Sequence, residues 1–184
     1  MPAAESSDNH VVTATLRFMF ETDHHPLLRD ITSALYGLEL LHDFAILATE
    51  DTHRGYVFDD SFWSRSKRPI ASEQLIRVSA LAFASPLTVD MSMTTSSGIT
   101  MLLAITHFID FWPLKREKLL LEIGKLRKIE PSPHPPDRQI TERLASITEQ
   151  GKASRIVRGI VQGLDTLPIR PIDVMIVDGN VMAG

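Results

Sequence analysis

Two side chains in this sequence have the types and spacing that acid–base chemistry needs, His107 and Asp110. They stand three residues apart in a segment that we expect to be helical, so they would share one face of that helix. Such a pair can act as a proton-transfer dyad. A histidine in an apolar helix is more often a hydrogen-bonded core residue, and we favour that alternative.

The densest group of potential metal ligands lies between the first expected strand and the first expected helix. Neighbouring residues on one turn rarely converge on an ion, and a zinc site usually draws ligands from separated segments. We therefore predict no metal site and no cofactor. The group is Glu21, Asp23, His24 and His25, and the separated histidines that could join it are His53, His107 and His134.

Ser96, Ser97 and Gly98 stand at an expected helix start, where free amide groups attract anions. The glycine spacing and the following lysine of a P-loop are absent, so helix capping explains these residues. The sequence contains no G-x-S-x-G, H-E-x-x-H or G-x-G-x-x-G motif. The residues therefore favour a protein that is not an enzyme, without deciding the question.

The composition is that of a globular protein of 184 residues, with a net charge of -4. An acidic balance gives no general attraction to nucleic acid or to anionic membranes, so we expect no nucleic-acid partner. The sequence contains no cysteine, which excludes disulfides and favours the cytoplasm. Residues 1–9 are small and polar, and we expect them to be disordered and without a secretory signal.

Alternation of apolar and polar residues predicts strands at residues 11–20, 75–84, 87–93 and 172–177. Ser85 and Pro86 join the second strand to the third as a hairpin, because proline has no amide hydrogen to donate. The second strand is apolar on both faces over part of its length. We therefore expect it to be a central strand.

Apolar residues spaced three and four apart predict helices at residues 27–49, 99–112, 115–128 and 138–164, the last with a break near Gly151. The first helix carries a second apolar face, more than one sheet can cover, and the third is amphipathic. We expect a partner or a second copy to cover these surfaces. The interaction residues predicted in this way are Leu40, Phe44, Leu47, Leu119, Ile123 and Leu126.

Two segments allow other interpretations. Residues 99–114 are too short for a membrane span of roughly 20 residues, so we favour a buried helix and keep peripheral membrane contact through Phe111 and Trp112 as a minor hypothesis. Residues 51–74 form a long loop in which aromatic and basic residues alternate, as in some phosphate-binding segments. We favour aromatic residues that hold the loop to the body, with the lysines and arginines exposed.

The order strand, helix, strand, strand, helix, helix, strand, with an extra helix between Asp137 and Leu164, predicts an α+β fold. We expect a two-layer ferredoxin-like sandwich with four mainly antiparallel strands, helices on one face, and an additional C-terminal helix. Prolines in residues 131–137 mark a stiff linker. Residues 10–130 would form the α+β core, and residues 138–184 would complete the same domain.

Residues 80–93, ALAFASPLTVDMSM, are followed by Gly98, an apolar helix and the charged segment beginning Lys115-Arg116-Glu117-Lys118. This succession resembles a loose group of uncharacterised bacterial proteins, mostly actinobacterial, over about a third of the chain. The resemblance implies no catalytic residue. It is compatible with an adaptor role in bacterial signalling or defence systems.

The leading hypothesis is a non-enzymatic interaction or oligomerisation module, whose partner is another protein or a second copy. The first alternative is a small ferredoxin-like enzyme or ligand-binding protein with a pocket near residues 51–74. The second is a peripheral membrane protein.

Overall fold

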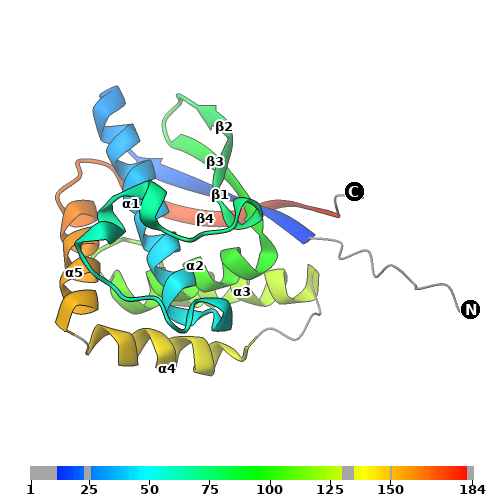
Figure 1. The fold of residues 1–184 in the computed structure, drawn as a ribbon. Helices are drawn as coiled ribbons and strands as arrows, with labels where there is room; N and C mark the ends of the chain where they lie inside the picture. The colour runs from blue at the N-terminus through cyan, green and yellow to red at the C-terminus, as the bar shows by residue number, and fades with distance from the viewer. Residues whose placement is uncertain (1–11, 23–25, 130–134, 150, 182–184) are drawn as a thin grey trace, which may run out of the picture.

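The computed structural model describes residues 12–22, 26–129, 135–149 and 151–181, with side chains up to residue 177. These residues form one antiparallel sheet and five α-helices, an α+β fold (Figure 1). Residues 1–9 and most of the proline-rich segment lie outside the described residues. In chain order the elements are β1 (Val12–Glu21), α1 (Leu28–Thr49), β2 (Arg77–Ala82), β3 (Leu87–Thr94), α2 (Thr95–Phe108), α3 (Arg116–Ile129), α4 (Asp137–Thr148), α5 (Gly151–Asp165) and β4 (Arg170–Val181).

The sheet has the strand order β2-β3-β1-β4, and every neighbouring pair is antiparallel. All four predicted strands are present in it. The prediction that the second strand is central is wrong, because β2 pairs only with β3 and forms one edge of the sheet. The central strands are β3 and β1, which provide the apolar alternation that the core requires.

The two faces of the sheet differ in chemistry. On β1, Leu16 and Phe18 are fully buried against the helices. The intervening Arg17 lies on the opposite face, where its guanidinium donates two hydrogen bonds of 2.7 Å to the carboxylate of Asp90 on β3. The polar face is therefore tied together across strands, and the core lies on the other side.

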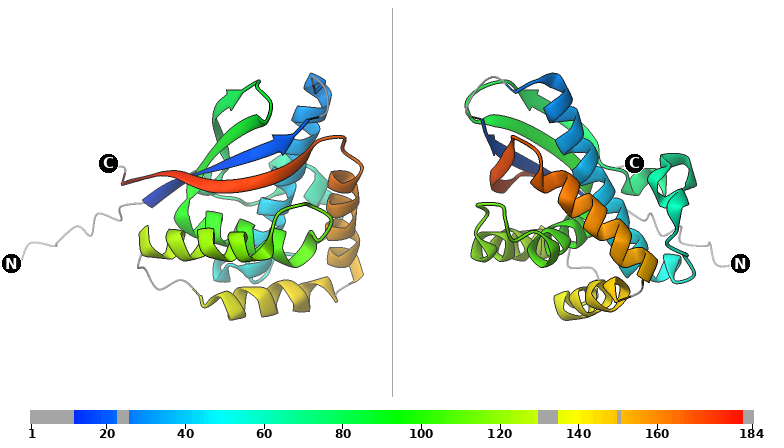
Figure 2. Two further views of the ribbon diagram at one scale, coloured as in Figure 1. Left: turned by 180° about the vertical axis from the view of Figure 1, so that it is seen from behind. Right: turned by 90° about the vertical axis from the view of Figure 1, so that its left-hand side faces the viewer.

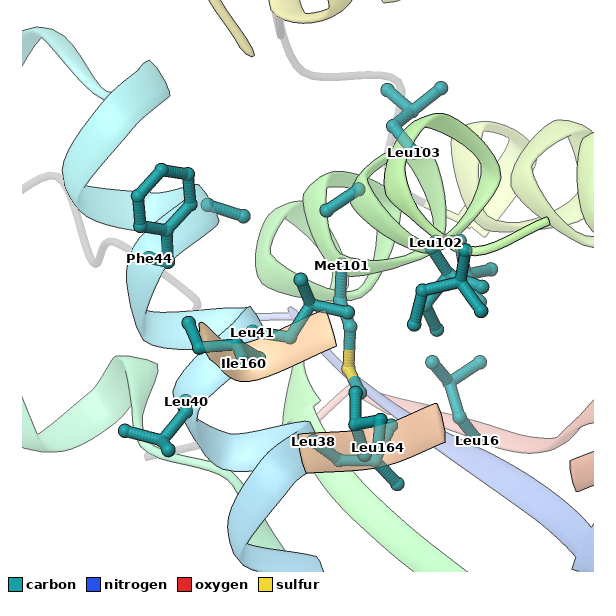
Figure 3. Close-up of a cluster of buried hydrophobic side chains, with 14 of the residues drawn as sticks. Leu16, Leu38, Leu40, Leu41, Phe44, Met101, Leu102, Leu103, Ile160 and Leu164 are labelled. Carbon is teal, nitrogen blue, oxygen red and sulfur yellow. The ribbon is translucent and has the colours of Figure 1, made fainter. Parts of the chain in front are cut away.

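The core lies between the sheet and the helices. Figure 3 shows Leu16 of β1 facing side chains of three helices, with Leu38 from α1, Leu102 from α2 and Leu164 from α5. Helices α1 and α5 approach closely at Gly37, where an added Cβ atom would lie 2.5 Å from Leu164 Cδ2. The absence of a side chain at Gly37 therefore sets the distance between these two helices.

Helix α2 begins and ends earlier than its apolar run predicts. It follows β3 directly, because the Thr94 hydroxyl caps it by accepting a hydrogen bond from the Ser97 amide, as capping predicts. It ends at Phe108 rather than at Trp112. A helix reaching Pro113 would bring the proline ring against the carbonyl of Ile109, and Ile109 indeed adopts an extended conformation.

The predicted helix over residues 138–164 is two helices, α4 and α5, which separate next to Gly151 as expected. Their buried residues, among them Leu144 and Ile160, belong to the same hydrophobic core as α1 and α2. Among the described residues, α1 is the one helix long and apolar enough to span a membrane, and 61% of its most apolar stretch is buried within the protein.

Candidate interaction surface

The second apolar face predicted on the first helix, α1, is buried within the protein. Leu40, Phe44 and Leu47 are at most 5% exposed, and the loop of residues 51–74 folds back over Phe44. The rings of Phe44 and Phe58 lie 4.8 Å apart, and Phe62 packs edge-on against Phe44. The expected exposed surface is thus covered by the chain itself, through the aromatic contacts expected for this loop.

A buried group of charges fastens the same loop to α1. Arg68 was expected in solvent, yet its side chain is 1% exposed, with Nη1 3.1 Å from Asp43 Oδ2 and Nη2 3.5 Å from Glu39 Oε1. The other oxygen of Asp43 lies 2.9 Å from His42 Nδ1, and both of these residues are buried. A buried cation needs anions to offset its lost hydration, so the cluster ties the loop to α1 at Arg68.

The apolar stripe predicted on the third helix is also internal. Leu119, Ile123 and Leu126 are at most 3% exposed and contribute to the core. On the same helix, Glu122 is 1% exposed and accepts a hydrogen bond of 3.2 Å from the backbone amide of Ile176 in β4. Helix α3 therefore packs against β4 through this predicted stripe, while Leu120 and Leu121 on the same helix are 45% and 60% exposed.

The proposed dyad is not assembled. Helix α2 ends at Phe108, so Asp110 lies beyond it and does not share the helical face of His107. Among the described residues, no hydrogen bond or ion pair joins these two side chains, and both are exposed. Partial burial, with the nearby charge of Arg116 as the second cause, lowers the pKa of His107.

The metal candidates are only partly within the described residues. Asp23, His24 and His25 lie outside them. In the parts of the chain that the structure describes, no three His, Cys, Asp or Glu side chains come together as a metal-binding group. In the long loop, Nε2 of His53 lies 4.0 Å from Oε2 of Glu50.

One group of exposed apolar side chains among the described residues lies at the free edge of β2; others are Leu27 and Leu28 at the start of α1, Val57 and Trp63 in the long loop, and Leu120 and Leu121 on α3. All six residues of β2 are exposed. Val78 is 50% exposed, Leu81 36%, and Phe83, one residue beyond the strand, 67%. Figure 1 shows the β2–β3 hairpin projecting beside the N-terminal half of α1, and both views in Figure 2 show the same arrangement.

A bulge in β2 gathers these residues on one face. Val78 pairs with Met91 and Leu81 pairs with Val89, with a register shift between them. Met91 and Val89 both point into the core, so their partners Val78 and Leu81 also lie on the helix-facing side of the sheet. An unbulged strand would place residues 78 and 81 on opposite faces.

A groove runs between this edge and α1. It has a volume of about 210 Å³ and is lined by Ile76, Val78 and Met91 on the sheet side and by Thr32, Leu35, Tyr36 and Glu39 of α1 on the other, so its lining is apolar except for Thr32 and Glu39. Tyr36 is 45% exposed, and its hydroxyl donates to the carbonyl of Trp63 at 3.3 Å. An apolar groove beside an unpaired strand edge is the geometry that an added strand recognises.

A second cavity, of about 320 Å³, lies where α1 meets the long loop. Its walls include Thr49, Glu50 and Asp51 from the end of α1 and Ser96 and Thr100 from the start of α2. Its volume is at the lower end of the range of small-molecule sites. The carboxylates at its rim are already engaged, since Glu50 accepts from Gln74 and Asp51 pairs with an arginine of α4.

The sequence pattern did not predict that β2 is an edge strand. Apolar residues on both faces of this segment are typical of a central strand, and the prediction followed them. The signal that identifies the edge is the spacing of Ile76, Val78, Leu81 and Phe83, which changes phase between residues 78 and 81. A change of phase within one strand is the mark of a bulge, and bulges are frequent at sheet edges.

Comparison of the chain with protein-family models, with curated proteins and with solved structures found no match. The fold and the exposed edge are therefore the basis on which function is inferred.

Proposed function

We propose that this protein is a non-enzymatic protein–protein interaction module of the ferredoxin-like class, and that it binds its partner through the β2 edge and the adjoining groove. The strand order β2-β3-β1-β4 and the helix between β1 and β2 support this class of two-layer sandwich. An adaptor role in a bacterial signalling or defence assembly fits such a module.

The proposal rests on one observation, that the edge strand β2 is exposed although it carries few charged residues. A six-residue edge strand with Val78 and Leu81 exposed, and with Arg77 as its one charged residue, lacks the charges that normally protect a free edge. Tyr36 lines the groove on the α1 side, and Phe83, one residue beyond the strand, adds a third exposed apolar side chain at this edge. Exposed apolar patches with unpaired backbone groups mark sites of protein association.

The test is site-specific photo-crosslinking in the source cell. A benzophenone side chain replaces Phe83, and a matched control carries it at Arg158, which is exposed on α5 far along the chain from the hairpin. We expect a protein adduct from position 83 that position 158 does not give. Equal adducts from both positions, or none from position 83, would contradict the proposal.

A ligand-binding role is the second candidate, and the cavity of about 320 Å³ beside residues 49–52 favours it. Thr52 is exposed at its rim, so Thr52→Trp should fill the cavity without disturbing the core. A thermal-shift screen of amines, sugars and carboxylic acids tests this role. The ligand-binding role requires that at least one compound raises the Tm of the native chain and does not raise the Tm of Thr52→Trp.

A further inference from the structure

The two edge strands of the sheet, β4 and β2, differ in their contacts with the rest of the protein. At β4, Glu122 accepts a hydrogen bond from the Ile176 amide, and Lys118 pairs with Asp173. At β2, none of the described helices lies along the outer side of the strand (Figure 1), and all six residues are exposed. Edge-to-edge pairing of two copies is therefore less hindered at β2 than at β4, where α3 contacts Asp173 and Ile176.

The residues along β2 form a pattern that is symmetric about its centre. Ile76, Val78, Leu81 and Phe83 are apolar, and the midpoint of the set falls between Ser79 and Ala80. When two such strands pair antiparallel about that midpoint, Val78 faces Leu81 of the other copy and Ile76 faces Phe83. The two Arg77 side chains lie at opposite ends, each facing an alanine.

The bulge makes this pattern consistent in three dimensions. It places Val78 and Leu81 on the same, helix-facing side of the sheet, next to the groove. The apolar pairs of both halves would therefore fall on one side of the joined sheets. A regular strand with the same residues would place one apolar pair on each face.

From these observations we infer that the partner at the β2 edge is a second copy of this chain. The two β2 strands pair antiparallel about the midpoint between Ser79 and Ala80 and join two four-stranded sheets into one. Phe83 of the partner subunit, opposite Ile76, enters the groove between Val78 and Tyr36. This inference rests on the proposed docking role of the β2 edge, and it names the occupant.

The expected assembly is a closed pair of moderate affinity. An isologous contact uses the same patch on both copies, so each groove receives one phenylalanine and no free β2 edge is left. Six-residue strands bury an area at the small end of specific interfaces. Interfaces of standard size range from micromolar to picomolar affinity, and for this smaller one we expect a dissociation constant at the weak end, on the order of micromolar.

The test uses sedimentation of the full chain and two charge variants, Val78→Lys and Leu81→Glu. Each variant alone places a charge against an apolar side chain, so each should weaken self-association about tenfold or more. Mixed in equal amounts they should associate again, because the new lysine and the new glutamate face each other in the proposed register. The control is Leu121→Glu, which is 60% exposed on α3 and should associate like the native chain.

Three results would overturn the inference. The first is a native chain that stays monomeric up to about 200 µM, far above the expected micromolar range. The second is a Leu81→Glu chain that dimerises like the native one. The third is an equal mixture of Val78→Lys and Leu81→Glu that does not associate again. Recovery in the mixture also shows that both variants are folded. The photo-crosslink at Phe83 separates the two proposals: an adduct with a different protein keeps the docking role and refutes the second copy, whereas no adduct refutes both.

Discussion

The position of Arg68 leads to a sharp prediction about what holds the long loop. Its side chain is 1% exposed and faces Asp43, which is 2% exposed, at 3.1 Å. Arg68→Met keeps most of the side-chain volume and removes the charge, so Asp43 stays buried without its cation. Removing one partner of a buried pair costs about 3–5 kcal/mol of unfolding free energy. In a chain of this length that corresponds to a fall in Tm of roughly 10 °C.

The matched control is a second arginine of the same loop. Arg65 pairs with Glu39 at 3.2 Å, but its side chain is 64% exposed. Arg65→Met should therefore cost less than about 1 kcal/mol. Urea unfolding followed by circular dichroism measures both values. If the two variants lost the same stability, burial would not be the reason that Arg68 matters.

A double variant tests the electrostatic reasoning itself. Asp43→Asn combined with Arg68→Met leaves no net charge in the pair, and replacing a whole buried pair costs less than breaking it. The double variant should therefore lose less stability than the sum of the two single variants. Additive losses would mean that Arg68 acts through packing on Phe62, whose ring centre lies 5.6 Å from the guanidinium.

Three further predictions concern other parts of the molecule. Gly37→Ala meets a core leucine at 2.5 Å and should cost about 1–3 kcal/mol, whereas Gly124→Ala, which meets nothing within 4 Å in α3, should stabilise by about 0.5–1 kcal/mol in thermal unfolding. Burial, with Asp59 as the second cause, raises the pKa of Tyr56 above its ordinary 10.0, so alkaline absorbance titration should show a late step that Tyr56→Phe removes. Glu122→Ala leaves the buried amide of the neighbouring strand without its acceptor, and it should cost about 1–3 kcal/mol and accelerate hydrogen exchange at Ile176; unchanged exchange there would contradict the role assigned to this carboxylate.

The parts of the fold that the sequence predicts are those set by local periodicity. The four strands, the two antiparallel partners of the hairpin and the break at Gly151 follow from residue spacing and from glycine and proline chemistry. The position of β2 in the sheet does not follow, because strand order depends on pairing between distant segments. The end of α2 was predictable in principle, since Pro113 forbids a helical carbonyl at Ile109.

The candidate surface was harder to predict than the fold. The spacing of Phe44 with Leu40 and Leu47 shows that α1 has two apolar faces, but it does not show which segment covers the second one. The covering segment is the loop with Phe58 and Phe62, and the buried Arg68 ties this loop to α1. How much apolar surface stays exposed depends on how the whole chain packs. The apolar face of a single helix in the sequence therefore does not show whether that face is exposed in the fold.

The difference between the two sheet edges would also limit the size of the assembly that we propose. A chain with two free edges would add copies at both ends and form open filaments. Here Glu122 and Lys118 tie α3 to β4, so a copy joined at β2 offers no second edge. Sedimentation at the highest soluble concentration should therefore show nothing larger than two 20.6 kDa chains. Species that keep growing with concentration would mean that the β4 edge opens, and that its contacts with α3 do not protect it.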